Sequence, residues 1–194
     1  MKIFDLYGVE DVKIEDPSLK RYINLDVKLV LKTRGRERER FGQARVNIVE
    51  RLINMLQVPG HRGKKHKVIT VASGKYTKQV NTLLAAFKII QEKTQQNPIQ
   101  ALVKAIENAA PRDEITVIEY GGARYPQAVD ISPMRRVNIV LHHLVHGAQD
   151  RVLNKKKNVA QALAEEIILA SSGSMDSLAM TKKNETEKQA DSAR

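Results

Sequence analysis

The sequence predicts a mainly α-helical protein: a single helical domain of five or six helices with a β-hairpin protruding between the third and fourth helices. Two patterns support this fold class. Apolar residues recur three and four positions apart along five separate segments, which is the spacing of a helix with one buried face. A single β-branched run, followed by Gly121-Gly122, interrupts the series and favours a hairpin.

The first part of the chain divides into an extension and three helices. Residues 1–42 show no sustained helical period and end in a basic run, so we expect an N-terminal basic extension that lies on another surface. The helical core is expected over residues 43–173. Its first three helices are expected from Gln43 to near Pro59, from about Tyr76 to about Lys93, and from Asn97-Pro98, a cap followed by proline, to before Pro111.

The hairpin and the remaining helices follow. The hairpin is expected at about 113–129, and Pro126, which cannot donate a backbone hydrogen bond, favours an arm that protrudes rather than one that joins a larger sheet. Ser132-Pro133 begins a long fourth helix, and Lys155 opens the segment of a fifth helix that ends before Gly173. In residues 174–194 the apolar period fades, which predicts a C-terminal helix or tail.

Composition bounds the function. Lysine and arginine number 33 against 22 acidic residues, and the net charge of +11 favours a polyanionic partner, nucleic acid first and an anionic membrane surface second. No apolar run approaches the roughly 18 residues of a membrane span, and no signal peptide is apparent, so we expect a cytoplasmic protein with no membrane partner. The absence of cysteine excludes disulfides and thiolate nucleophiles.

No motif supports catalysis or a cofactor. His142 and His146 have the spacing of a metalloprotease helix, but His143 stands where such a site needs a glutamate as general base. The glycines of residues 60–63 do not match a P-loop, and although they match the GxxG loop of a KH module, helices rather than strands are expected around them. We therefore expect no enzyme, no cofactor, no metal and no small-molecule substrate.

Five basic clusters recur at helix starts and loops, where cations can reach phosphates without disturbing the apolar stripes. Two adjacent arginines in the first turn of the fourth helix oppose its dipole, which suggests an anion nearby. Five tyrosines and three phenylalanines are too few for a broad base-stacking surface, so stacking is at most local. The candidate cations are Arg34, Arg36, Arg38, Arg40, Arg62, Lys64, Lys65, Lys67, Arg112 with Arg124, Arg135, Arg136, Lys155, Lys156 and Lys157.

Several stretches together carry a family resemblance. They are residues 49–55, 63–65, 97–111, 114–123 and 164–167, and above all Gln127-Ala-Val-Asp-Ile-Ser-Pro-Met-Arg-Arg-Val-Asn138. The chain resembles the universal small-subunit ribosomal protein seven family, in its archaeal and eukaryotic branch, over roughly residues 20–183. The stretch from Gly121 to Asn138 is highly specific.

The resemblance implies a structural ribosomal protein, not an enzyme. Family members bind the 3′ major domain of small-subunit rRNA, nucleate assembly of the head, and lie among neighbouring head proteins near the subunit interface. Carried onto this chain, Lys64, Lys65, Arg135 and Arg136 would face rRNA. The hairpin tip would face the tRNA exit site, close to the path of mRNA; it comprises Gly121, Gly122, Ala123, Arg124 and Tyr125.

The chain departs from bacterial members of the family in a longer N-terminal part, an enlarged segment between Val58 and Lys78, and a C-terminal end that lacks their aromatic residues. An alternative function, from another class, is that of a regulatory DNA-binding protein with a helical recognition element. Such a protein would prefer duplex DNA to structured RNA, so competition between the two would separate the hypotheses.

Overall fold

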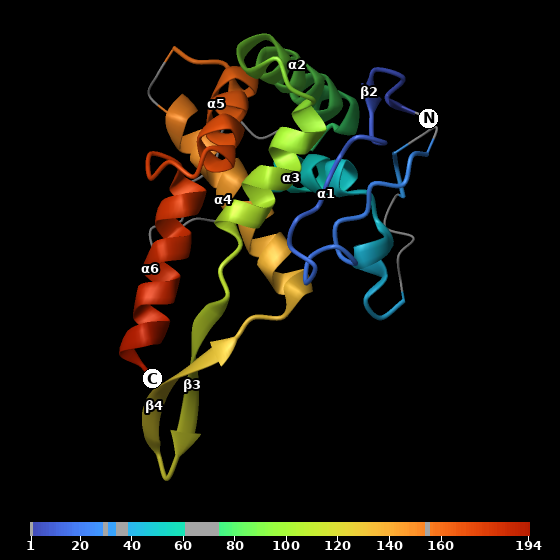
Figure 1. Cartoon of the computed structure of the whole chain (residues 1–194). Helices are drawn as coiled ribbons and strands as arrows, with labels where there is room; N and C mark the ends of the chain where they lie inside the picture. The colour runs from blue at the N-terminus through green and yellow to red at the C-terminus, as the bar shows by residue number, and fades with distance from the viewer. Residues whose placement is uncertain (1, 29–30, 34–38, 61–73, 154–155) are drawn as a thin grey trace.

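Six α-helices form the body of the molecule in the computed structural model, which describes residues 2–28, 31–33, 39–60, 74–153 and 156–194 (Figure 1). They are α1 (Ile48–Gln57), α2 (Tyr76–Thr94), α3 (Pro98–Ala109), α4 (Pro133–Val152), α5 (Val159–Ser171) and α6 (Leu178–Ser192). Between α3 and α4, the antiparallel strands β3 (Asp113–Tyr120) and β4 (Ala123–Asp130) form a hairpin. The predicted fold class is therefore confirmed.

Local capping decides where the helices begin. The side chain of Asn97 accepts a hydrogen bond from the backbone N–H of Ile99 (3.0 Å), and Pro98 occupies the first turn, so α3 begins where the sequence predicts. The start of the first helix differs from the prediction, and the expected start near Gln43 is wrong. Residues 42–45 form a short 3₁₀ helix, η1 (Gly42–Arg45), and α1 begins only after Asn47, whose side chain caps it.

The hydrophobic core lies between the helices, with α5 packed against α2, α3 and α4. The apolar stripes found in the sequence supply it. Every member of the α4 stripe is buried, from Val137 to Ala148, and Phe87 of α2 is the largest fully buried side chain. Buried alanines along α5 allow its neighbours to approach closely, which suits a central helix: Ala160, Ala162, Ala164 and Ala170.

The N-terminal segment packs along the helical body and adds its own residues to the core. Ile3, Leu19, Ile23 and Leu31 are all buried, although they have no regular spacing. A two-stranded pair, β1 (Lys2–Ile3) and β2 (Tyr7–Gly8), opens the segment. Farther along, side chains of α3 bind its backbone: Gln100 accepts from the N–H of Lys13 (2.7 Å), and Glu107 accepts from those of Glu15 (2.7 Å) and Asp16 (2.9 Å).

The hairpin extends away from the helices (Figure 1). Gly121 and Gly122 form its two-residue turn with φ angles of +57° and +82°, a left-handed pair that glycine adopts without steric cost. Pro126 lies opposite Val117, on a strand that has no second neighbour among the described residues. The hairpin is therefore anchored only at its base.

The C-terminal segment forms α6, which is fixed at a buried ionic centre that we name the Glu166 junction: Gly147, Arg151, Glu166 and Ser177. The carboxylate of Glu166 accepts hydrogen bonds from Arg151 Nε (2.9 Å) and Ser177 Oγ (2.8 Å). Gly147 faces it from α4, where a Cβ atom would lie 2.7 Å from the carboxylate. The junction thus joins α4, α5 and the start of α6.

The body of α6 supports the base of the hairpin (Figure 1). Glu187 accepts a hydrogen bond from the backbone N–H of Arg112 (3.1 Å), and Arg194 forms an ion pair with Asp113. Lys183 donates to the carbonyl of Asn108 at the end of α3 (2.7 Å). Among the described helices, none has both the length and the apolar character that a membrane span requires.

Candidate nucleic-acid interface

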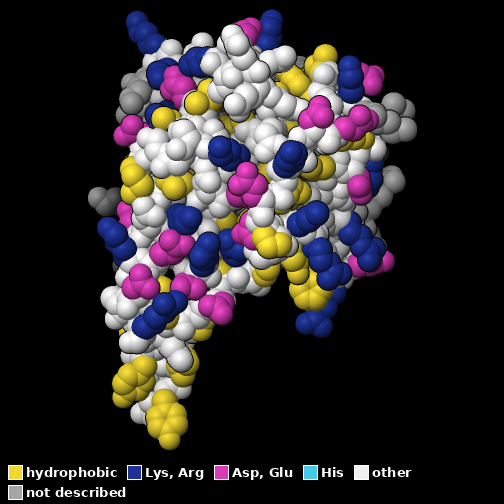
Figure 2. All heavy atoms as spheres, viewed as in Figure 1, with side chains coloured by type: hydrophobic (Ala, Val, Ile, Leu, Met, Phe, Trp, Pro, Cys, Tyr) yellow, Lys and Arg dark blue, Asp and Glu magenta, His cyan; other side chains and the backbone are white. Residues whose placement is uncertain are grey.

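The candidate cations occupy several parts of the molecule. Arg34, Arg36, Arg38, Arg62, Lys64, Lys65, Lys67 and Lys155 lie outside the described residues. Among those described, Arg40, Arg112, Arg124, Arg135, Lys156 and Lys157 are exposed. Figure 2 shows lysines and arginines spread over this face of the helical body with acidic residues between them, and hydrophobic side chains at the end of the hairpin.

Arg135 forms an ion pair with an acidic side chain of the protein itself, Glu114. From the first turn of α4 its guanidinium binds both carboxylate oxygens of Glu114 in β3, with Nε–Oε1 and Nη2–Oε2 distances of 2.8 Å. These hydrogen bonds hold the pKa of Arg135 above its usual value. The side chain remains 59% exposed, so a phosphate could still approach it. The anion suggested by the helix dipole is therefore supplied by Glu114.

Arg136 requires a correction, because it does not face solvent. Its side chain is only 9% exposed. Nε donates to the carbonyl of Pro111 (3.0 Å), Nη1 to Ser18 Oγ (2.7 Å) and Nη2 to Asp16 Oδ2 (3.2 Å). Neighbouring residues of a helix point about 100° apart, so Arg135 turns outward while Arg136 turns toward the N-terminal segment. Arg136 is thus a structural residue that anchors this segment to α4.

The pKa of Asp16 reflects this anchor. Burial by itself raises that pKa, but hydrogen bonds from Ser18 and the charge and hydrogen bond of Arg136 outweigh burial. The net result is a pKa below the usual value, so the carboxylate stays ionised at neutral pH.

A second buried arginine, Arg51 of α1, was not among the residues predicted from sequence. Its guanidinium donates to the carbonyl of Tyr22 (2.9 Å) and to Asn138 Oδ1 in α4 (2.8 Å). Burial lowers the pKa of Arg51 to about 10, still well above neutral pH, so the group carries its charge inside the protein. Nothing in the local pattern marked it, because an arginine beside an apolar stripe usually lies on the solvated face.

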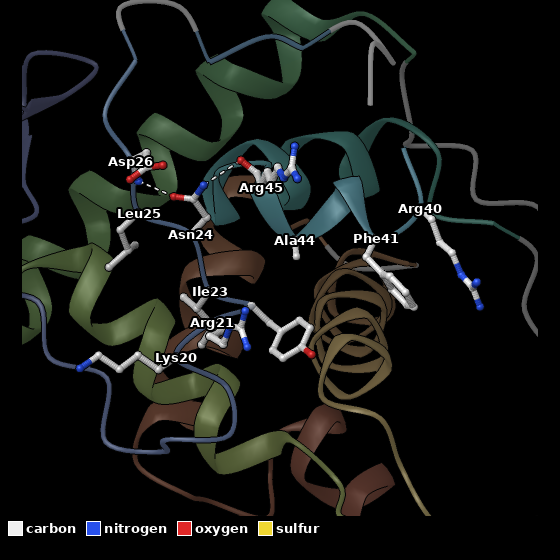
Figure 3. Close-up of a pocket in the computed structure, with 11 residues that line it drawn as sticks. Lys20, Arg21, Ile23, Asn24, Leu25, Asp26, Arg40, Phe41, Ala44 and Arg45 are labelled. Carbon is white, nitrogen blue, oxygen red and sulfur yellow. Dashed lines mark hydrogen bonds between the residues drawn. The ribbon is translucent and has the colours of Figure 1, made fainter. Parts of the chain in front are cut away.

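Two cavities lie beside the residues that Arg51 binds: Tyr22 lines both of them, and Asn138 lines the second. The first, of about 640 Å³, lies between residues 20–26 and the loop leading into η1 (Figure 3). The second, of about 690 Å³, lies over α4 and is lined by apolar residues such as Met55, Met134 and Ile139. Tyr22 and Phe41 line both cavities. We call the combined depression the Tyr22–Phe41 trough.

Cations surround the first cavity of the trough. Asp26 is the single acidic side chain among the described residues that line it. Arg45 also pairs with Glu39 nearby (2.7 Å), but both side chains are largely exposed, and such pairs are weak. The lining cations are Lys20, Arg21, Arg40 and Arg45. Sequence reasoning found only Arg40, because the others are separated along the chain and form no cluster until the segment folds back on η1.

The remaining candidates lie elsewhere. Lys157, between α4 and α5, binds the carboxylate of Glu165 (2.8 Å and 3.0 Å), and this hydrogen bond lowers the pKa of Glu165 despite its partial burial. Arg124 lies at the hairpin tip, 3.7 Å from Glu119. The structure therefore does not gather all the predicted cations at one site.

The histidines of α4 contact the backbone and one another. His146 is buried, and its Nε2 lies 2.6 Å from the carbonyl oxygen of Pro59. The ring of His142 packs against the ring of His146, with 3.8 Å between the two ring centroids. Across the described parts of the chain, no group of three or more potential ligands is arranged to hold a metal ion. His142 and His143 instead line the second cavity of the trough.

A helical body with cations on its surface and a projecting hairpin fits the class of structural proteins that bind nucleic acid through its phosphates. Comparison with known proteins agrees with this class. The family model described as ribosomal protein S7p/S5e matches residues 19–194. The chain is also 48% identical, over 196 residues, to small ribosomal subunit protein uS7 of Nanoarchaeum equitans (strain Kin4-M), with 100% of this chain and 99% of the relative covered.

The chain therefore belongs to the ribosomal protein S7p/S5e family, and the resemblance found in the sequence, including its archaeal type, is confirmed. Proteins of this family are structural parts of the ribosome, the cytoplasmic ribonucleoprotein that carries out translation.

Proposed function

We propose that this protein binds the 3′ major domain of small-subunit rRNA and nucleates assembly of the head of the small ribosomal subunit. It belongs with the structural, non-catalytic constituents of that subunit, as its family and its archaeal relative indicate. The single observation that carries the proposal is the family match, which extends over residues 19–194. The net charge of +11 gives it a physical basis.

The exposed lysines and arginines of the helical body bind RNA by neutralising its phosphates. Each phosphate neutralised by a lysine or arginine releases condensed counterions, which supplies affinity without reading sequence. Folded RNA is then recognised by the spacing of these cations, since the deep groove of its helices hides the base edges. Among the described residues, the exposed candidates of the helical body are Arg40, Arg112, Arg135, Lys156 and Lys157.

Footprinting tests the proposal. The purified protein would be bound to full-length small-subunit rRNA, with duplex DNA as competitor, across a range of salt concentrations. We expect protection confined to the 3′ major domain, resistance to DNA, and an affinity that falls steeply with salt. Diffuse protection that DNA abolishes would reject this function and favour the alternative of a helical DNA-binding regulatory protein.

The hairpin would contact tRNA and mRNA rather than rRNA. We place its tip, residues 121–125, near the tRNA exit site and the path of mRNA, with the body near the subunit interface among neighbouring head proteins. The hairpin is suited to this because it projects beyond the helices and exposes Tyr120 and Tyr125. Replacing Tyr125 by alanine should leave rRNA binding intact but reduce tRNA occupancy of the exit site in reconstituted subunits. Unchanged occupancy would remove the tip from that site.

A further inference from the structure

We propose that the Tyr22–Phe41 trough binds one unpaired nucleotide of an RNA strand, with the base stacked on the ring of Phe41 and the adjoining phosphates held by the surrounding cations. This inference rests on the proposed function and deepens it. Of the cations that line the first cavity, the sequence predicted only Arg40 as a candidate.

Phe41 is placed in a way that folding alone does not favour. Its φ angle is +62°, in the left-handed region where a side chain other than glycine or asparagine is strained. The residue is nevertheless 64% exposed, so burial does not offset that strain. We therefore infer a binding role for Phe41 from its left-handed backbone together with its place in the lining of both cavities.

The ring of Phe41 already contacts a cation, the guanidinium of Arg40. The guanidinium of Arg40 lies 5.3 Å from the centroid of the Phe41 ring. The two side chains project from the loop before η1 in the same direction (Figure 3). A base that stacks on the ring would bring its own phosphates close to Arg40, which combines the two contacts that proteins use for unpaired nucleotides.

The other cations surround the first cavity. Lys20 and Arg45 extend away from its centre at the rim (Figure 3), where phosphates of a strand entering or leaving would pass. The buried guanidinium of Arg51 donates to the carbonyl of Tyr22, a residue that lines both cavities, and its charge is screened less in the protein than in water. The charge of the trough is therefore complementary to a phosphate backbone.

Hydrogen bonds hold the two walls in place before any ligand arrives. Asn24 donates to the carbonyl of Arg45 (2.7 Å) and accepts from the N–H of Asp26 (2.6 Å), as the dashed lines in Figure 3 show. Its own carbonyl accepts from the N–H of Ile48, the first residue of α1 (2.8 Å). A site that is already ordered loses little conformational entropy when it binds.

Size and chemistry select an unpaired nucleotide over other ligands. A first cavity of about 640 Å³ falls within the range of roughly 300–1,000 Å³ typical of small-ligand sites. A regular duplex keeps its bases stacked away from a ring such as Phe41, and an acidic peptide would satisfy the cations without using the ring. The second cavity, with Met134 and Ile139, offers apolar surface to the next base or ribose.

The test uses the full chain and full-length small-subunit rRNA. The chain has no tryptophan, so Phe41→Trp introduces a unique fluorescent reporter whose emission a stacked base quenches. We expect rRNA to quench it. We expect Phe41→Ala to weaken binding roughly tenfold or more, because stacking contributes about that factor per base. Since no charge is lost, the dependence of log affinity on log salt should keep its slope.

Conservative variants separate stacking from simple apolar contact. Phe41→Tyr keeps an aromatic face and should retain affinity, whereas Phe41→Leu keeps apolar area without that face and should lose as much as Phe41→Ala. Leu6→Ala removes another exposed apolar side chain, one that does not line the trough, and should bind as the unaltered protein does. Thermal unfolding should be unchanged in the Phe41 variants, because the ring is exposed.

A charge variant tests the phosphate contacts independently. Lys20→Gln combined with Arg21→Gln should reduce the salt slope by about 1 to 2, because each lost phosphate contact lowers it by slightly less than one. A slope equal to that of the unaltered protein would remove both residues from the site.

Failure of this inference is distinguishable from failure of the proposed function. If the unaltered protein binds the 3′ major domain selectively and Phe41→Ala or Phe41→Leu binds equally well, the stacking site is rejected while the proposed function stands. If the unaltered protein loses rRNA to duplex DNA, the proposed function fails, and the inference that rests on it fails as well.

Discussion

The Glu166 junction and the Tyr22–Phe41 trough use similar charged residues in opposite surroundings. At the junction Glu166 is completely buried, and each of its oxygens accepts hydrogen bonds from nearby groups, including Arg151. In the trough, Arg21, Arg40 and Arg45 lie open to solvent. In this basic protein the buried charges fix the helices to one another, and the exposed charges are available for an anionic partner.

Two neighbours in the sequence repeat this contrast. Arg135 lies on the surface against Glu114, while Arg136 is enclosed by groups of the N-terminal segment and by the carbonyl of Pro111. Their residue type and their helix are the same. Only the direction in which each side chain leaves α4 separates a candidate rRNA contact from a structural anchor.

The largest effect is expected from breaking the junction. Glu166→Ala removes the buried carboxylate and leaves Arg151 without its partner, which typically costs about 3–5 kcal/mol. Urea unfolding followed by circular dichroism would measure this loss. Glu165→Ala, one residue earlier and paired with Lys157 at the surface, is the matched control and should cost less than about 1 kcal/mol. Equal losses in the two variants would contradict the comparison.

A smaller effect is expected when the arginine anchor is removed. Arg136→Ala abolishes three hydrogen bonds and leaves the carboxylate of Asp16 without its cation, so we expect a loss of about 2–3 kcal/mol in the free energy of unfolding. Arg135→Ala should change stability by less than about 1 kcal/mol and should instead weaken rRNA binding. If Arg135→Ala lost stability while Arg136→Ala only weakened rRNA binding, Arg135 would be the structural anchor and Arg136 the rRNA contact.

An added side chain at Gly147 would crowd the Glu166 junction. In Gly147→Ala the new Cβ atom would lie 2.7 Å from Glu166 and 3.0 Å from Leu178, so one of them must move. Although alanine favours a helix, we expect a net destabilisation of about 1–2 kcal/mol. Thermal unfolding would detect it. A variant as stable as the unaltered protein would show that the junction is loosely packed.

The smallest effect concerns pH. Because the pKa of Asp16 in the folded protein is lower than the unfolded value of 3.8, its ionised form stabilises the fold above that value. This contribution is lost as pH falls below 3.8 and through the folded pKa. Asp16→Asn should therefore be less stable than the unaltered protein at pH 6, and the difference should shrink as pH falls below 3.8. A stability difference independent of pH would exclude the linkage.

Several elements could be predicted from local sequence because their causes are local. The stripe from Val137 to Ala148 specifies a helix with one buried face, and Asn97-Pro98 specifies the start of α3. Gly121-Gly122 supplies the left-handed pair that a two-residue turn requires. The start of α1 was misplaced because the apolar stripe shows which residues face the core but not which residue caps the helix.

Local sequence patterns therefore specify the fold class, the order of the elements and the basic character of the surface. Tertiary structure decided which cations are buried and where the trough forms. Arg136 meets Ser18 across 118 residues of sequence, and the N-terminal segment buries Leu19 and Ile23 without any periodic signal. The physical reason is that periodicity and capping depend on residues a few positions apart, whereas burial and charge pairing depend on which distant segments fold against each other.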